Sequence, residues 1–138
     1  MKRYEILSAR ITWAQFLQQP EREKAIGNLD EGDEKRCCLG HGCYCLGVVR
    51  RLLDFDARYA YGEEEAQVCP PKEFAEAVGL WSRDGCAKSL QDLIREKESL
   101  AELNDETDIT PQEIGAYLES VVEGGPDTPF RPLSDYEA

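Results

Sequence analysis

The sequence predicts a predominantly helical α+β protein, with about five short helices and one small β-hairpin. Apolar residues recur at helical spacing in several segments, and Gly or Pro residues close these segments. The chain has 138 residues, of which 41% are hydrophobic and 32% are charged, which is enough for one core. No linker-like change of composition divides it, so we expect a single domain over residues 1–138.

The N-terminal segment predicts a helix over residues 4–19. Its apolar residues follow helical spacing, and they are Leu7, Ile11, Trp13, Ala14, Phe16 and Leu17. Pro20 closes the segment. Residues 20–36 are polar and charged with two turn signals, and we expect a mobile loop there.

The middle of the chain predicts a second helix over residues 43–55 and a hairpin over residues 57–69. Gly47 falls inside this helix, which indicates that another backbone packs closely there. The hairpin is predicted by two short strand-like runs that flank a turn at residues 62–65.

Two further helices are predicted after the hairpin. One begins at Pro70-Pro71 and stops at Gly79, since proline suits a first helical turn and glycine suits a helix end. The other spans residues 88–103 and is followed by an interhelical turn at residues 103–108.

The last helix has the clearest signals. Thr110 and Glu113 have the spacing of a capping box, and Pro111 stands at the first helical position. Apolar residues then recur at helical spacing until Gly124-Gly125. Residues 124–138 contain three prolines around Phe130 and predict an extended strap with one aromatic anchor.

The net charge of −12 is unevenly distributed. Residues 98–138 contain 11 acidic residues and only one basic residue, a net charge of −10. A surface of this sign repels phosphate backbones, so we expect no direct binding to nucleic acid. It would attract a basic groove on another protein, including one that holds DNA or RNA.

Four of the six cysteines and the single histidine gather at residues 37–47. Without a visible secretion signal, the cysteines indicate reduced thiols in a cytosol. Cys38, His41 and Cys43 could supply three zinc ligands, with Cys69 or Cys86 as the fourth. No paired Cys-x-x-Cys spacing supports this alternative.

Two other interpretations of this segment stay open. Cys43 could act as a thiol nucleophile with His41 as its base. The interpretation we favour is structural: buried thiols act as small apolar groups, and Gly40, Gly42 and Gly47 permit close packing. No catalytic residue and no cofactor are therefore assigned.

The order of several short motifs resembles that of an uncharacterised family of small phage, prophage and bacterial proteins. These motifs are Trp13-Ala14, Tyr44-Cys45-Leu46-Gly47-Val48, Pro70-Pro71, Gly79-Leu80, Leu103-Asn104-Asp105 and Glu113-Ile114-Gly115. The resemblance covers residues 4–123, with one departure: Tyr44 stands where the family has the first of two adjacent cysteines. It implies a mobile-element origin, where small acidic proteins often block host machinery.

These observations favour a non-enzymatic accessory protein that binds and inhibits a host protein in the bacterial cytoplasm. Its contact residues would be Glu119, Glu123 and Asp127 in the acidic C-terminal third. An alternative is a protein that sequesters a small ligand or a nucleotide signal. The cationic and aromatic candidates for that function are Arg50, Arg51, Arg58, Tyr59 and Tyr61. A zinc-dependent or thiol-dependent enzyme is the second alternative. No membrane span is expected, because no apolar run is long enough.

Overall fold

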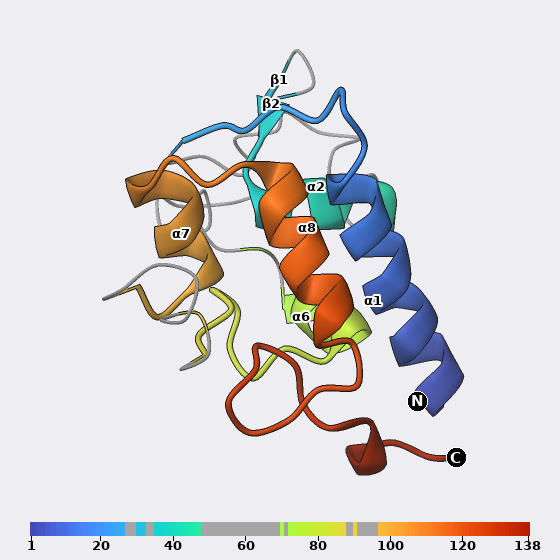
Figure 1. Ribbon diagram of the computed structural model, residues 1–138. Coiled ribbons are helices and arrows are strands. Elements are labelled where there is room, and N and C mark those ends of the chain that lie inside the picture. Colours follow the sequence, from blue (N-terminus) through green and yellow to red (C-terminus); the bar gives the residue numbers. More distant parts are fainter. Residues whose placement is uncertain (27–29, 33–34, 48–69, 71, 88–89, 91–96) are drawn as a thin grey trace.

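The computed structural model describes residues 1–26, 30–32, 35–47, 70, 72–87, 90 and 97–138, and its α-helices dominate this part of the chain (Figure 1). A predominantly helical α+β fold is therefore confirmed. The elements in chain order are α1 (Arg3–Leu17), β1 (Asp30–Gly32), β2 (Lys35–Arg36), α2 (Cys38–Cys45), α6 (Lys72–Val78), α7 (Leu100–Glu106), α8 (Pro111–Ser120) and the 3-10 helix η2 (Leu133–Asp135).

Helices α1 and α8 lie side by side and run in opposite directions (Figure 1). At the end of α1, the Gln112 side chain donates to the carbonyl oxygen of Gln19 at 2.8 Å. In the middle, Gly115 permits the close approach, since a Cβ atom there would lie 2.6 Å from the Ala14 carbonyl oxygen. This contact lets the two helix backbones approach far more closely than larger side chains would allow.

The centre of the core is a cluster of three fully buried aromatic rings, Trp13, Phe74 and Phe130. The Trp13 ring meets the other two edge to face, with centroids 5.0 Å from Phe74 and 6.0 Å from Phe130. The Trp13 indole nitrogen donates to the Cys38 carbonyl oxygen at 2.9 Å. One residue on α1 thereby joins α2, α6 and the C-terminal segment, and its polar atom is satisfied as burial requires.

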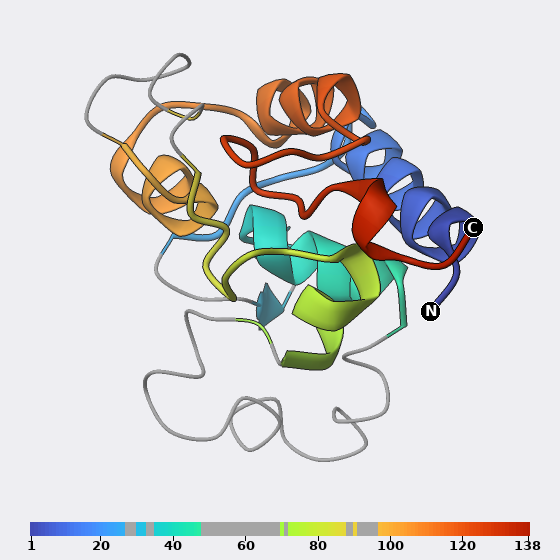
Figure 2. The ribbon, with the colours of Figure 1, turned by 90° about the horizontal axis from the view of Figure 1, so that it is seen from below.

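Both ends of the described chain meet at one side of the molecule (Figure 2). The Arg3 amide donates to the Glu137 carbonyl oxygen at 2.8 Å, and the Arg3 side chain donates to the carbonyl oxygens of Leu133 and Tyr136. The segment that contains Phe130 therefore returns to the first turn of α1.

The predicted second helix is misplaced. Instead of residues 43–55, the structure has α2 at Cys38–Cys45, and its C-cap is Leu46. The helix begins earlier because Cys37 caps it, its sulfur accepting from the Gly40 amide at 3.3 Å. It ends before Gly47, whose φ of +73° is the left-handed conformation typical of a helix C-terminus. Residues 48–55 and the predicted hairpin over residues 57–69 lie outside the described residues.

The loop predicted over residues 20–36 contains a short antiparallel pair. Asp30 pairs with Arg36, and Gly32 pairs with Lys35. The Ala25 amide also donates to the Arg36 carbonyl oxygen at 3.0 Å. Backbone hydrogen bonds to a neighbouring stretch of chain thus order residues that their charged composition alone assigns to a loop.

The helix predicted over residues 88–103 is also wrong in its bounds. Ser99 is extended and caps α7 by accepting from the Glu102 amide, so no helix passes through it. Helix α7 then continues through the predicted turn as far as Glu106. Within α7 the Asn104 side chain is buried. It forms hydrogen bonds with the backbone of Cys38 and of Ala25.

The signals at the ends of α6 and α8 are confirmed. Gly79 follows α6 with a φ of +70°. The capping box of Thr110 and Glu113 is formed at the start of α8, with Pro111 at its first position. Helix α8 ends at Ser120 with Val121 as its C-cap, which is before the end of the apolar pattern that predicted it.

Candidate functional site

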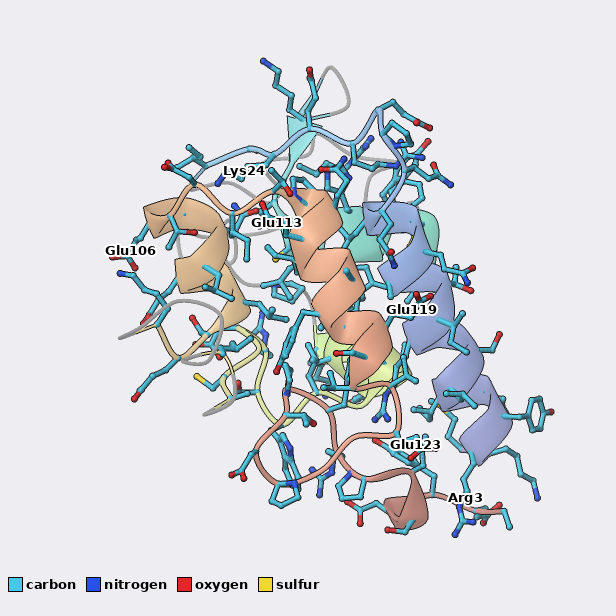
Figure 3. The ribbon with its side chains drawn as sticks, in the orientation of Figure 1. Arg3, Lys24, Glu106, Glu113, Glu119 and Glu123 are labelled. Carbon is cyan, nitrogen blue, oxygen red and sulfur yellow. The ribbon has the colours of Figure 1, made fainter. Side chains whose placement is uncertain are left out.

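The three acidic side chains predicted to bind a partner are exposed around the end of α8. Glu119 lies on α8 and Glu123 lies in the turn that follows, as Figure 3 shows, and Asp127 lies near the start of the C-terminal segment 124–138. The Glu119 carboxylate accepts from the Gln15 amide at 3.4 Å. None of the three forms an ion pair with a residue that the structure describes, so their charge is not neutralised there.

Other carboxylates of the acidic third do have cationic neighbours. Glu106 lies 3.3 Å from Lys97, Asp135 lies 3.4 Å from Arg131, and Glu137 lies 3.6 Å from Lys2. Such exposed pairs stabilise the fold little, but they lower the local negative charge. Glu119, Glu123 and Asp127 therefore belong to the carboxylates of this third that no described ion pair neutralises, together with Glu102, Asp108 and Glu113.

The Cys/His segment lies inside the protein. Cys38, His41 and Cys43 are fully buried on α2, and the His41 Nε2 atom lies 2.6 Å from the Glu23 carbonyl oxygen. Cys86, a predicted fourth zinc ligand, is exposed, and Cys69 lies outside the described residues. Within the described ranges, no group of three or more Cys, His, Asp or Glu side chains is placed to hold a metal ion.

Burial makes these thiols less acidic than an ordinary cysteine. It raises the pKa of Cys38 and of Cys43 well above the usual value of 9.0 and raises the pKa of Cys45 to about 12. A thiolate is the form that attacks a substrate or binds a metal. These thiols are protonated at neutral pH, which opposes both chemical interpretations of the segment.

The glycines of the segment have two different functions. A Cβ atom on Gly42 would lie 2.5 Å from Cζ of Phe74 and 2.8 Å from Nε1 of Trp13. Gly42 therefore permits α2 to approach the aromatic cluster, as predicted. For Gly47 no described atom lies within 4 Å of such an atom, so the predicted close packing has no described partner, and its φ of +73° is the feature that requires glycine.

The cationic and aromatic residues predicted to bind a small ligand all lie outside the described residues. They are Arg50, Arg51, Arg58, Tyr59 and Tyr61. That predicted site therefore has no described geometry.

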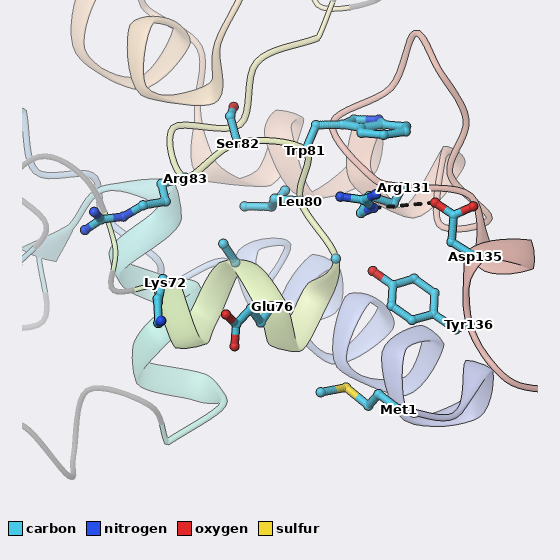
Figure 4. Close-up of a pocket in the computed structure, with 12 residues that line it drawn as sticks. Met1, Lys72, Glu76, Leu80, Trp81, Ser82, Arg83, Arg131, Asp135 and Tyr136 are labelled. Carbon is cyan, nitrogen blue, oxygen red and sulfur yellow. Dashed lines mark hydrogen bonds and ion pairs between the residues drawn. The ribbon is translucent and has the colours of Figure 1, made fainter.

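A cleft of about 510 Å³ lies between α6 and the C-terminal segment (Figure 4). Trp81 and Arg131 form part of its wall, and Leu80 contributes apolar surface. Sequence reasoning missed this site because its cationic residues are far apart in the chain: Lys72, Arg83 and Arg131. The one available signal was Trp81, a large aromatic residue directly after the helix-ending Gly79-Leu80.

Sequence reasoning also missed Arg10, which is fully buried among apolar residues. Burial lowers the pKa of Arg10 to about 10. Its side chain donates to the carbonyl oxygens of Val78, Gly79, Val122 and Arg131. The available signal was its position, since Arg10 stands three residues after Leu7 and four before Ala14 in the apolar stripe.

No helix in the described part of the chain is long and apolar enough to cross a membrane. The family resemblance depends on the order of the sequence motifs and stays a prediction. Comparison of the chain with protein-family models, curated proteins and solved structures gave no match.

Proposed function

We propose that this protein acts by binding another protein rather than by catalysis, and that its contact surface is centred on Glu119, Glu123 and Asp127. The observation that supports this most directly is that these three carboxylates are exposed and form no ion pair with a described residue. A partner with a basic surface would neutralise them.

The partner we propose is a bacterial host protein with a basic groove, including one that normally holds nucleic acid. Unpaired carboxylates attract such a groove over a distance set by salt screening, which is about 8 Å at physiological ionic strength. The motif resemblance supports a mobile-element origin, and with it inhibition of that host protein in the bacterial cytoplasm. A basic groove covered by this protein would be closed to its own polyanionic ligand.

The experiment begins with the identification of the partner. The tagged protein is used to capture proteins from a bacterial lysate, and each captured protein is purified for titration calorimetry. The test variant combines Glu119→Gln, Glu123→Gln and Asp127→Asn. We expect its affinity to fall at least about tenfold, and we expect added salt to weaken the native complex by screening the same charges.

A matched control separates the position of the charges from their number. Glu5, Glu21 and Glu73 are also exposed and lie on or near α1 and α6. Their combined change to Gln removes the same three charges. The proposal holds if this control binds as the native protein does while the test variant binds more weakly, and it fails if both triple variants bind equally well.

A further inference from the structure

The cleft beside α6 has the size and wall of a small-molecule site. Its volume of about 510 Å³ falls within the range of about 300–1,000 Å³ that is usual for such sites. One wall comes from α6 and the turn after it, and the other comes from the C-terminal segment near η2 (Figure 4). Ala75, Gly79 and Leu80 contribute apolar surface between the walls.

The aromatic residue of this cleft is exposed but held in place. Trp81 keeps 42% of its surface accessible. Its indole nitrogen donates to the Gly125 carbonyl oxygen at 3.2 Å, and its amide donates to the Pro129 carbonyl oxygen at 3.1 Å. An indole fixed in this way offers a ring face at little entropic cost to a ligand.

Arg131 lies over one face of this ring. Its guanidinium carbon lies 4.9 Å from the centre of the Trp81 ring, and its Nε atom lies 3.4 Å from an Asp135 oxygen. Neither of its terminal nitrogens forms a hydrogen bond to any described residue. These two nitrogens have the fork geometry that suits a phosphate or a carboxylate.

The charge of the cleft differs from that of the whole protein. Lys72, Arg83 and Arg131 line it with Glu76 and Asp135, so three cations meet two anions. The net charge of the chain is −12, and Arg131 is the single basic residue among residues 98–138. A local excess of positive charge in such a protein favours an anionic ligand at this position.

We propose that this cleft binds a small planar-ring anion. Its phosphate or carboxylate group accepts hydrogen bonds from the terminal nitrogens of Arg131, and its ring packs in the cleft against Leu80 and the part of the Trp81 ring that Arg131 does not cover. Stacking on an aromatic side chain is general for flat rings, and the arginine fork selects those with an oxyanion. None of Glu119, Glu123 and Asp127 lines this cleft, although Trp81 contacts Gly125 in the loop between Glu123 and Asp127.

The test uses the whole protein and two probes, adenosine monophosphate for the phosphate and 1-naphthoate for the carboxylate. Binding is followed by the NMR signal of the Trp81 indole N–H, which the Trp81→Phe variant assigns. Saturable movement of this signal with adenosine monophosphate, but not with adenosine, identifies a phosphate ligand. Movement with naphthoate, but not with naphthalene methanol, identifies a carboxylate ligand, and either result supports the proposal.

The variants test the assigned contacts. Arg131→Gln should weaken binding of the active probe at least tenfold, while Asp135→Asn should strengthen it by removing a competing carboxylate. Lys35→Gln is the control for charge, because Lys35 is exposed on β2 at the other end of the molecule (Figure 1). The backbone contacts of Arg131 to Gly79 and Arg10 do not depend on its side chain, so circular dichroism should show that Arg131→Gln is folded.

Two results would overturn the proposal. One is a Trp81 signal that stays unchanged with both probes at millimolar concentration, and the other is equal binding by the Arg131→Gln variant. The triple variant at Glu119, Glu123 and Asp127 should bind the probe at least as tightly as the native protein, because it removes negative charge near an anion site. Probe binding by this variant therefore tests the cleft independently of the proposed protein contact.

Discussion

The guanidinium carbon of Arg10 lies 4.5 Å from the centre of the Phe130 ring, inside the core. The same side chain donates to Val78 at 2.6 Å, to Val122 at 2.8 Å and to Arg131 at 2.8 Å. These acceptors are backbone carbonyl oxygens at the ends of α6 and α8 and in the C-terminal segment. A single cation from α1 therefore satisfies carbonyl groups on three other parts of the chain.

We expect Arg10→Lys to lower the free energy of unfolding by about 3 kcal/mol, since a hydrogen bond to a charged group contributes about 1.5–3 kcal/mol. A lysine has one nitrogen atom and cannot reach acceptors in several directions as the guanidinium does. Urea unfolding followed by circular dichroism measures the change.

The control for Arg10 is Arg131→Lys, because the Arg131 side chain is exposed. We expect that change to alter the free energy of unfolding by less than about 0.5 kcal/mol. Equal effects of the two variants would show that the carbonyl contacts of Arg10 do not stabilise the fold.

Asn104 gives a second prediction. Its side-chain oxygen accepts from the Cys38 amide at 3.1 Å, and its nitrogen donates to the Ala25 carbonyl oxygen at 2.7 Å. Asn104→Asp replaces the donor by an oxygen and leaves a buried carbonyl group unsatisfied. We expect a loss of about 2–3 kcal/mol in the free energy of unfolding, measured by urea titration at neutral pH.

Gln112 is the matched residue for this test. It also uses a side-chain amide to reach two backbone carbonyl oxygens, those of Gln19 and Arg22, but it is only partly buried. Water can replace its contacts, so Gln112→Glu should cost less than about 1 kcal/mol. A loss as large as that of Asn104→Asp would contradict the importance of burial.

Gly42 and Gly47 give a third prediction, since both stand in the same segment for different reasons. Gly42→Ala forces a methyl group against Phe74 and Trp13, and we expect a loss of about 1–3 kcal/mol from overpacking. Gly47→Ala meets no described atom within 4 Å but has a φ of +73°, which costs about 1–2 kcal/mol for a residue with a side chain.

Asparagine separates these two causes, because it tolerates the left-handed conformation better than alanine does. Gly47→Asn should recover part of the stability that Gly47→Ala loses, as measured by thermal unfolding. Gly42→Asn should be worse than Gly42→Ala, because the larger side chain increases the clash. A Gly42→Asn variant more stable than Gly42→Ala would show that the contact with Phe74 and Trp13 does not limit the size of the side chain at position 42.

The sequence predicted the elements whose signals are local. The capping box of Thr110 and Glu113 depends on residues within one helical turn, and Gly79 ends α6 through its own backbone conformation. These features could be predicted because the interacting atoms are close in the chain.

Elements fixed by distant residues were misplaced. The start of α2 combines the local Cys37 cap with a distant contact, in which the Cys38 amide donates to the side chain of Asn104, 66 residues away on α7. The cleft likewise combines Trp81 with Arg131, which no sequence spacing relates. The exposure of Glu119, Glu123 and Asp127 could be predicted from their charge. That they form no ion pair with a described residue could be recognised only from the fold.

The buried thiols give the last prediction, a loss of stability at alkaline pH. Burial raises the pKa of Cys45 from 9.0 to about 12, and it raises the pKa of Cys38 and Cys43 as well. Above pH 9 the unfolded chain releases thiol protons that the folded chain retains. The folded state then binds more protons, so the free energy of unfolding falls as pH rises.

For Cys45 this loss amounts to about 1.4 kcal/mol between pH 8 and pH 10. Cys45→Ala should therefore flatten the pH dependence of the free energy of unfolding by about that amount, as measured by urea titrations at both pH values. The interval ends at pH 10 because the lowered pKa of Arg10, about 10, acts in the opposite direction above it. Cys86→Ala is the control, since Cys86 is exposed and solvent reduces its effect. An unchanged pH dependence in Cys45→Ala would show that the Cys45 thiol ionises as readily in the folded protein as in the unfolded chain.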